Sequence, residues 1–299
     1  KETMAVSDHV TILRSGKSVE FLKTTETTEK ELAALMVGYE IDMTLERKKV
    51  EKGETILSLQ NVRLLPQAEK TVDLEIRAGE ILGIAGVEGN GQQQLEEMIM
   101  GLEKVKCGKI FFKQEEITGM SVKERCKRGI GYIPSDRYKR AILPGFSLKD
   151  NYLLGNQYKD SYARKGMLNQ EYIEKKTKEL MEKFDVRAVN GDQLIGALSG
   201  GNQQKLVLSR EVDKDPDLIL ACQPVRGLDI GAIKFIHNVL LELRNQGKAV
   251  LLISAELSDL FQLSDRIGVL YKGEMMSLQE TEKYTTESIS LLMAGKKGV

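Results

Sequence analysis

The residue pattern that most directly suggests chemistry is a Ser-Gly-Gly turn that runs into a polar, helix-forming segment. It comprises Leu198, Ser199, Gly200, Gly201, Asn202, Gln203, Gln204 and Lys205. Two adjacent glycines let the backbone approach a ligand closely, and the N–H groups at a helix start favour an anion such as phosphate. The pattern alone is not specific, because Ser-Gly-Gly also occurs in ordinary turns. The prediction of an anion-binding turn therefore depends on the rest of the chain.

A second glycine-rich segment follows an apolar run at residues 81–85 and precedes a helical run at 94–100. It consists of Gly86, Val87, Glu88, Gly89, Asn90, Gly91, Gln92 and Gln93. Strand, glycine loop and helix form the setting in which a nucleotide phosphate loop works. Two of the glycines have the spacing of that loop, but Gln92 replaces the lysine that reaches the phosphates, and Gln93 replaces the hydroxyl that holds Mg²⁺. A plain glycine turn stays open as an alternative, whereas a dinucleotide fingerprint fits worse because its glycine order differs.

Two further apolar runs end in residues that lack the usual chemistry of phosphate-loop ATPases. In such enzymes a strand ends in Asp-Glu, which supplies a Mg²⁺ ligand and a carboxylate that polarises the attacking water. After residues 218–221, Cys222 takes the Asp position and Gln223 the Glu position. A neutral thiol is a poor Mg²⁺ ligand, and an amide can hold water but cannot take its proton. After residues 249–253, Ala255 stands where a His would contact the γ-phosphate.

These motifs need elements to position them, and short apolar runs alternate with longer helical patterns along the chain. The runs predicted as strands are residues 81–85, 218–221, 249–253 and 267–271. Residues 233–244 have helical spacing, and the alternation favours an α/β domain with a mostly parallel sheet. Residues from about 150 to 212 are rich in Lys and Glu. They predict a helical insert that carries the Ser-Gly-Gly turn.

The chain contains a repeat of part of itself at a fixed offset of 257 residues. The identical pairs are Ser7 and Ser264, Asp8 and Asp265, Leu13 and Leu270, Gly16 and Gly273, Thr24 and Thr281, Thr28 and Thr285, Leu35 and Leu292, Met36 and Met293, and Gly38 and Gly295. This period is too long for a solenoid, so it indicates a duplicated domain. We expect residues 1–45 to be the C-terminal tail of a first copy, 46–54 a charged linker, and 55–299 a second, complete copy.

Composition narrows the classes of function. The chain has 299 residues, with 44 basic and 44 acidic side chains and 41% hydrophobic residues. The neutral balance argues against an electrostatic nucleic-acid binder, and the hydrophobic share allows a substantial core. No apolar run is long enough to span a bilayer, and the first residues do not read as a secretory signal. The cysteines (Cys107, Cys126, Cys222) lack pairing or metal spacing and His9 and His237 are isolated, which predicts reduced thiols and structural histidines.

The order of these motifs resembles that of the ATP-binding-cassette (ABC) ATPases. The glycine loop, Ile-Pro at 133–134, Leu-Ser-Gly-Gly at 198–201, Gly-Leu-Asp at 227–229 and Ser-Ala-Glu at 254–256 follow one another, so the resemblance covers residues 55–299. It implies an α/β, phosphate-loop NTPase-like fold: a mostly parallel sheet with an inserted α-helical subdomain at about 145–212. In detail the motifs look like the second cassette of tandem ATPases from bacterial sugar and nucleoside importers. Gln223-Pro224 leans toward the nucleoside branch.

The resemblance also implies roles for the two glycine motifs. Cassettes of this family meet head to tail, so each ATP lies between the phosphate loop of one and the signature turn of the other. Ser199, Gly200 and Gly201 would close over ATP and Mg²⁺ on a first cassette, and Asp229 would help to link the two sites. This chain's own loop would bind nucleotide weakly, with doubtful Mg²⁺ binding, and would not hydrolyse it. The family usually has a Mg²⁺-sensing Gln where this chain has Ser135, and no aromatic residue between Ile56 and Ala78 could stack on adenine.

The implied function is the ATP-binding part of an importer for a nucleoside or monosaccharide, at the cytoplasmic face of the membrane. Its implied partners are a first cassette of the same polypeptide, transmembrane permease subunits and, indirectly, an extracytoplasmic substrate-binding protein; no nucleic acid is expected. The complete protein would be an ATPase. This chain alone has no intact catalytic residue and would be inactive or very slow. Two alternatives stay open: a non-transport ABC protein acting on DNA or ribosomes, and a structural pseudo-ATPase domain.

Overall fold

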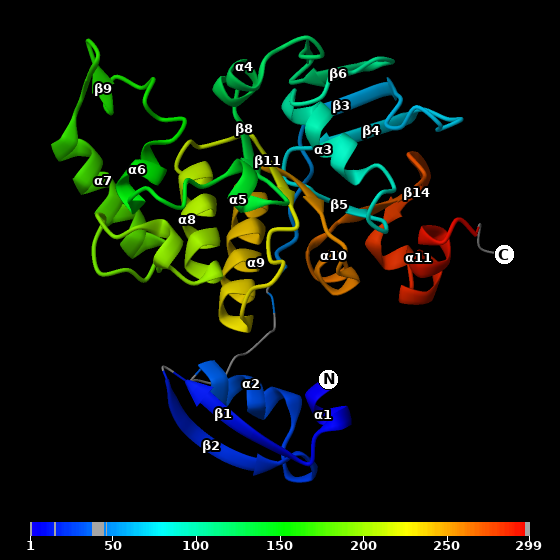
Figure 1. The fold of residues 1–299 in the computed structure, drawn as a ribbon. Helices are drawn as coiled ribbons and strands as arrows, with labels where there is room; N and C mark the ends of the chain where they lie inside the picture. The colour runs from blue at the N-terminus through cyan, green and yellow to red at the C-terminus, as the bar shows by residue number, and fades with distance from the viewer. Residues whose placement is uncertain (1, 15, 38–44, 46, 297–299) are drawn as a thin grey trace.

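A six-stranded sheet forms the centre of the computed structural model, which describes residues 2–14, 16–37, 45 and 47–296 (Figure 1). The strand order is β14-β13-β5-β12-β11-β8. These strands are β5 (Ile81–Ala85), β8 (Ile130–Ile133), β11 (Leu218–Cys222), β12 (Ala249–Ile253), β13 (Arg266–Tyr271) and β14 (Glu274–Glu280). All neighbouring pairs are parallel except β13 and β14, which are antiparallel. The prediction of an α/β fold with a mostly parallel sheet is confirmed.

The central strands are buried on both faces, which is why their sequences are continuous apolar runs. In β11, Ile219 and Ala221 pack into one hydrophobic layer, while Leu218, Leu220 and Cys222 pack into the other. The first layer is completed by α8 (Gly200–Val212) and α9 (Ile230–Asn245). The second is completed by α3 (Gln92–Met100). The sheet is therefore held rigidly between layers, and the loops at the ends of its strands are well positioned for a site.

A second, antiparallel sheet, which was not expected from the sequence, covers the hydrophobic layer beside α3. Its order is β4-β3-β6-β7. The strands are β3 (Thr55–Val62), β4 (Val72–Arg77), β6 (Lys109–Phe112) and β7 (Glu115–Glu116), followed along the chain by α4 (Val122–Lys127). β4 alternates strictly between buried and exposed residues, as expected for a strand with one face on the core.

The inserted subdomain is mainly α-helical, and it also contains a short hairpin and a 3₁₀ helix. After α5 (Arg137–Arg140), the chain forms α6, a short β9–β10 hairpin, α7 and the 3₁₀ helix η2 before it reaches α8. Their bounds are α6 (Leu148–Leu153), β9 (Ala163–Arg164), β10 (Met167–Leu168), α7 (Gln170–Lys183) and η2 (Ile195–Ala197). The hairpin strands are two residues long, too short to leave an alternating pattern in the sequence.

The N-terminal unit has the same local structure as the C-terminal end of the sheet domain. It comprises α1 (Glu2–Val6), β1 (His9–Arg14), β2 (Lys17–Lys23), η1 (Thr24–Glu26) and α2 (Glu29–Val37). Its counterparts are α10 (Leu257–Leu263), β13, β14, η3 (Thr281–Lys283) and α11 (Thr286–Met293). At the offset of 257 residues, every cross-strand pair of β1 and β2 matches a pair of β13 and β14, and the register shift falls at the same place.

The two copies also share side-chain hydrogen bonds. The Thr24 hydroxyl donates to the Ser7 carbonyl at 2.6 Å, and the Thr281 hydroxyl donates to the Ser264 carbonyl at 2.7 Å. The repeated sequence positions therefore correspond to repeated structural roles. In the described part of the chain, no helix is both long and apolar enough to cross a membrane.

Candidate functional site

The glycine loop joins β5 to α3, and the turn between β13 and β14 holds it in place. The Asn90 side chain accepts a hydrogen bond from the Lys272 N–H at 2.9 Å, and the Asn90 carbonyl accepts one from the Gly273 N–H, also at 2.9 Å. Gly89 and Gly91 have φ angles of 90° and 107°, which glycine adopts without strain. No side chain caps the first N–H groups of α3. The loop therefore keeps the form of a phosphate cradle at a helix start.

Gln92 folds back into this loop instead of extending from it. Its Nε2 donates to the Val87 carbonyl at 3.1 Å. A Cβ atom on Gly86 would lie only 2.2 Å from Nε2, so the amide rests directly against the loop backbone. The other amide atom, Oε1, is buried and has no hydrogen-bond partner. Because Oε1 is an acceptor, it offers nothing to a phosphate oxygen, and Gln92 cannot act as the missing lysine does.

Gln93 is also turned away from the position of a magnesium ligand. Its amide donates to Glu97 Oε1 at 2.8 Å along α3. Glu97 forms an ion pair with Arg140 of α5. Burial would raise the pKa of Glu97, but hydrogen bonds from Gln93 and Arg140 outweigh it and hold this pKa below its usual value. The side chain of Gln93 thus supports a charged pair at the edge of the loop.

A buried carboxylate, Glu96, occupies the space behind the loop, and the sequence analysis missed it. Glu96 is 2% exposed and accepts hydrogen bonds from the Tyr132 hydroxyl and from the Ser135 N–H at 3.3 Å. The Cys222 thiol also hydrogen-bonds to Glu96; burial first, and then this carboxylate, raise the pKa of Cys222 well above its usual value. Cys222 is therefore a neutral thiol. A signal was available, since Glu96 lies beside Leu95 on the helix side that also carries Ile99.

Gln223 and Ala255 lie side by side at the ends of β11 and β12. The Gln223 N–H donates to the Ile253 carbonyl at 2.7 Å, and Gln223 Oε1 accepts the Ala255 N–H at 3.3 Å. Gln223 has a φ of 48°, a left-handed conformation that is uncommon for a non-glycine residue. The structure therefore brings Ser135, Cys222, Gln223 and Ala255 to the same end of the parallel strands as the glycine loop.

The chemistry of this set of residues fits a phosphate but not a magnesium ion. The cradle offers backbone N–H groups at a helix start, which suit phosphate oxygens. The side chains at the lysine, metal, base and histidine positions of such a site are three amides, a neutral thiol and a methyl group. None of these residues (Gln92, Gln93, Cys222, Gln223, Ala255) carries a hard anionic oxygen. Gln223, at the position where the family resemblance implies a general base, is an amide and cannot take a proton.

The Ser-Gly-Gly turn lies at the start of α8, as predicted. Ser199 is the N-cap residue, and its Oγ accepts hydrogen bonds from the Asn202 N–H at 3.4 Å and from Asn202 Nδ2 at 3.1 Å. Gly201 needs its lack of a side chain, because a Cβ there would lie 2.9 Å from the Ala232 Cβ and 3.1 Å from Asp229 Oδ2. The turn is therefore packed directly on the start of α9.

Gln203 and Asp229 hold the turn in place from two sides. Gln203 Nε2 donates to the carbonyls of Ile195 and Leu198, each at 3.2 Å, and its Oε1 accepts from Arg137 Nε at 3.2 Å. Asp229 caps α9 by accepting the Ala232 N–H at 2.9 Å. A cavity of about 410 Å³ opens beside the turn, with Ser199, Gly201 and Asp229 in its wall.

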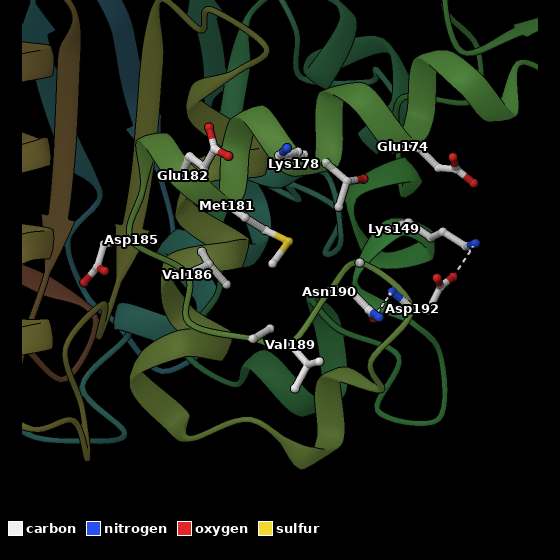
Figure 2. A pocket seen from close by; sticks show the side chains of 13 residues that line it. Lys149, Glu174, Lys178, Met181, Glu182, Asp185, Val186, Val189, Asn190 and Asp192 are labelled. Carbon is white, nitrogen blue, oxygen red and sulfur yellow. Dashed lines mark hydrogen bonds and ion pairs between the residues drawn. The ribbon is translucent and has the colours of Figure 1, made fainter.

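A larger cavity of about 550 Å³ lies elsewhere in the inserted subdomain, between α7 and residues 185–192 (Figure 2). Met181, Val186 and Val189 give it an apolar wall, and an ion pair between Lys149 and Asp192 lies at its side. It contains no residue of the glycine loop or of the Ser-Gly-Gly turn. Its size does not make it the chemical site of this molecule.

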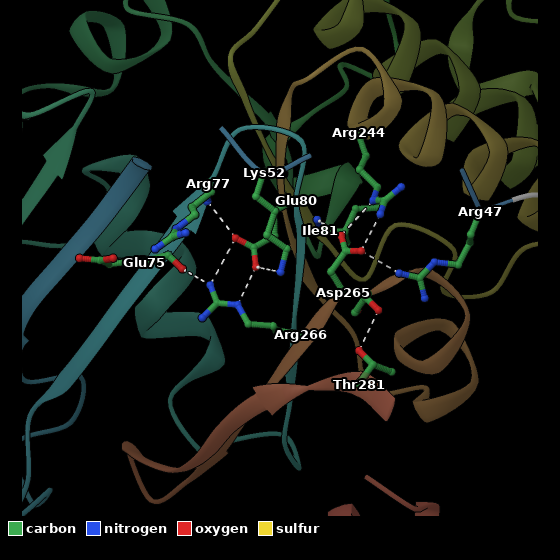
Figure 3. Close-up of polar contacts among 11 residues, drawn as sticks. Arg47, Lys52, Glu75, Arg77, Glu80, Ile81, Arg244, Asp265, Arg266 and Thr281 are labelled. Atoms are coloured by element: carbon green, nitrogen blue, oxygen red, sulfur yellow. Dashed lines mark hydrogen bonds and ion pairs between the residues drawn. The ribbon is translucent and has the colours of Figure 1, made fainter. Parts of the chain in front are cut away.

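Buried charges at the opposite end of the sheet hold residues 47–53 in place (Figure 3). Asp265 forms ion pairs with Arg244 at 2.7 Å and Arg47 at 2.9 Å. Glu80, fully buried, pairs with Arg266 at 2.6 Å and Lys52 at 3.5 Å. Since Glu80 precedes β5 and the glycine loop follows it, this network supports the sheet from the end remote from the loop.

These features define a class of protein: a parallel sheet with a glycine loop after β5, and an inserted subdomain ending in a Ser-Gly-Gly turn, form an ATP-binding cassette. MJ1267, an ATP-binding cassette of an ABC transporter, has this fold with a TM-score of 0.65 at 22% identity, over 81% of this chain and 96% of that chain. A dimeric MJ0796 cassette bound to ADP and Pi gives a TM-score of 0.64 at 23% identity, over 77% of this chain and 100% of that chain.

The sequence comparisons place the chain more closely. Residues 69–226, just over half of the chain, match the ABC transporter family, and the chain belongs to this family. It is 40% identical to the guanosine import ATP-binding protein NupO of Bacillus subtilis (strain 168), over 97% of this chain and 58% of NupO. It is 37% identical to the nucleoside import ATP-binding protein NupA of Lactococcus lactis subsp. cremoris (strain MG1363), over 98% of this chain and 59% of NupA. The chain therefore spans less than two thirds of the length of these relatives.

Proposed function

We propose that this chain is the ATP-binding part of an importer for a nucleoside or a monosaccharide. NupO and NupA are named for guanosine and nucleoside import, and a relative of 34% identity from Clostridium tetani, over 96% of this chain and 57% of its own, is named for ribose import. The higher identities favour a nucleoside. The chain would act at the cytoplasmic face of the membrane on transmembrane permease subunits, and a substrate-binding protein outside would deliver the cargo.

We further propose that the chain is the second half of a tandem polypeptide. Residues 1–45 would be the tail of a first cassette, 46–54 the linker, and 55–299 the second cassette, with its helical subdomain at 145–212. The observation that carries this proposal is the shared register of β1–β2 and β13–β14. In the second copy, β13 also pairs with β5. Among the described residues β1 pairs only with β2, and a first cassette would supply the strand that corresponds to β5.

The Ser-Gly-Gly turn would then complete a nucleotide site on the first cassette. Ser199 and the N–H groups of Gly200 and Gly201 would face the phosphates of ATP, whose Mg²⁺ would be held by residues of that cassette. Asp229 would connect the two sites, because its carboxylate caps α9 and touches the Gly201 backbone region. The supporting geometry is the cavity of about 410 Å³ beside the turn, whose wall includes the exposed Ser199 and the buried Gly201.

The chain's own glycine loop would bind nucleotide weakly and leave it intact. Backbone N–H groups at the start of α3 would hold a phosphate. Gln92 would add no positive charge, because its Nε2 donates to Val87 and its Oε1 is an acceptor. Gln223 could orient a water molecule by hydrogen bonds but could not remove its proton. ATP turnover in the complete protein would therefore take place at the site that this chain completes, not at its own loop.

The test is the substitution Ser199→Arg in the full-length protein assembled with its permease. The bulky cation would fill the space that phosphate needs, and we expect ATPase activity to fall by about 10²-fold or more, as on loss of a transition-state donor. Ser121→Arg is the matched control, because Ser121 is also an N-cap serine whose Oγ accepts the N–H of the third helical residue. Activity retained in Ser199→Arg would contradict the proposal. Equal losses in both variants would show only a capping effect.

A further inference from the structure

We propose that Asn202 is a positioning residue that reserves the hydroxyl proton of Ser199 for a phosphate oxygen. The inference rests on the proposed function, since it concerns the same nucleotide site on a first cassette. It adds that Ser199 acts there as a hydrogen-bond donor, because Asn202 fills both acceptor positions of its hydroxyl oxygen.

The orientation of the Asn202 amide is fixed by its neighbours. Its Oδ1 accepts a hydrogen bond from the Arg187 N–H at 2.9 Å. A backbone N–H can only donate, so the oxygen must face Arg187 and the nitrogen must face Ser199. Nδ2 then donates to Ser199 Oγ at 3.1 Å. A flipped amide would place two donors against each other at Arg187.

The loop that carries Arg187 is itself tied to α8. Lys205 Nζ donates to the Asp185 carbonyl at 3.0 Å and pairs with Asp185 Oδ2 at 2.7 Å. Lys205 lies three residues after Asn202, so the same helix holds both ends of the arrangement. The Lys205 side chain is largely buried, at 10% exposed, which favours a stable contact. The Arg187 N–H is therefore held in position and sets the orientation of the Asn202 side-chain amide.

The number of hydrogen bonds that the Ser199 hydroxyl can form determines where its proton points. A serine oxygen can accept two hydrogen bonds and donate one. Ser199 Oγ already accepts from Nδ2 and from the Asn202 N–H, so both acceptor positions are filled. Only the proton is left, and it must point away from Asn202. A phosphate oxygen is a charged acceptor, and a hydrogen bond to it is stronger than one to a neutral group.

Asn202→Asp tests this polarity in the full-length protein assembled with its permease. The two side chains have nearly the same shape, but both carboxylate oxygens can only accept. One oxygen would still accept the Arg187 N–H, and the other would take the Ser199 proton. We expect the kcat for ATP to fall by about 10²-fold, as on removal of one donor from a transition state. Asn202→Ala frees the hydroxyl to rotate and should cost less, about tenfold, the value of one ordinary hydrogen bond.

Two comparisons separate this effect from added charge and from general damage. Asn190 lies in the wall of the other cavity, and its Oδ1 accepts the Asp192 N–H at 3.0 Å, so Asn190→Asp brings the same change of charge without contact to Ser199; it should stay within a few-fold of wild type. In a Ser199→Ala background, Asn202→Asp should cause little further loss, because Asn202 acts through the hydroxyl. A merely structural role would instead make Asn202→Ala at least as harmful as Asn202→Asp.

The outcomes distinguish this inference from the proposed function. If Ser199→Arg abolishes activity but Ser199→Ala does not, the composite site stands and the donor claim fails. The donor claim also fails if Asn202→Asp is as active as Asn202→Ala, or if its loss persists in full after Ser199→Ala. If Ser199→Arg itself is active, the proposed function fails first.

Discussion

At the residue scale, a buried carboxylate, Glu96, lies behind the chain's glycine loop. Glu96 is a buried carboxylate that accepts hydrogen bonds from Tyr132, Ser135 and Cys222. The donors are neutral, and those of Tyr132 and Ser135 converge on the same carboxylate oxygen, Oε1. Glu96 on α3 therefore lies beside the end of β11, and a second carboxylate placed at the end of β11 would contact it.

Restoring the aspartate of an active ATPase at this position should therefore be harmful. Cys222→Asp would replace a donor with a second carboxylate against Glu96, in a place where Cys222 is fully buried. Two adjacent buried carboxylates cannot both ionise easily. We expect the variant to lose about 3 kcal/mol of unfolding free energy, measured by urea denaturation at pH 7.

A second substitution should recover this loss. In Cys222→Asp with Glu96→Leu, the repulsion disappears, and we expect at least half of the lost stability to return. Glu116→Leu is the control, since Glu116 lies on the exposed strand β7 and pairs with Lys109 on the surface. If the control recovers stability as well as Glu96→Leu does, the repulsion is not the cause.

At the element scale, ion pairs join β5, β13 and α9 to residues 47–53. Asp265 has a pKa below its usual value: burial acts in the opposite direction, but hydrogen bonds from Arg244 and the Ile81 N–H, and the charge of Arg47, outweigh it. A carboxyl with a lowered pKa in the folded state stabilises the fold at pH values above its unfolded pKa. That contribution is lost as the pH falls through the lowered folded value.

Asp265→Asn should remove this contribution. At pH 7 we expect a loss of about 3 kcal/mol, because Arg244, whose side chain is only 6% exposed, would lose its charged partner. Below about pH 4, where the aspartate of the unfolded chain becomes protonated, the difference in stability should begin to shrink, and it should be lost as the pH falls through the lowered folded value. Urea denaturation over a pH series measures this. Glu280→Gln, which breaks the exposed pair with Lys283, should change stability by less than about 1 kcal/mol. A constant difference at every pH would contradict the expectation.

Elements with a continuous apolar pattern could be predicted from the sequence. β5 and β12 lie at residues 81–85 and 249–253 as expected, and α9 extends the expected helix by a few residues at its start. β3, β4 and the β9–β10 hairpin were missed, because edge and half-buried strands mix polar and apolar residues. At the site, the residue types at Gln92, Cys222 and Gln223 could be recognised. The contacts of Glu96 and of Asn202 could not, because they depend on which distant residues pack together.

At the scale of the whole molecule, the residues of the glycine loop should determine how the isolated chain binds nucleotide. The residues that stand at the lysine, metal, base and histidine positions of this loop are Gln92, Gln93, Cys222, Gln223 and Ala255, and none of them offers a carboxylate to Mg²⁺. We expect calorimetry with ATP to show binding weaker than micromolar, and the same affinity with and without Mg²⁺, because a metal contributes only where it has ligands. Micromolar binding that depends on Mg²⁺ would contradict the description of the loop. Steady phosphate release by the chain alone would contradict it as well.

The match between the N-terminal unit and the C-terminal end of the sheet domain extends to the spacing of their elements. The strands and 3₁₀ helix of the N-terminal unit match those at the C-terminal end in length and register, and its second helix begins at the same place, although most side chains differ: His9 corresponds to Arg266, and Lys23 to Glu280. Backbone spacing has thus been kept where residue identity has not. The two segments are interchangeable in length, so a chimera carrying one in place of the other would need no added or deleted residue.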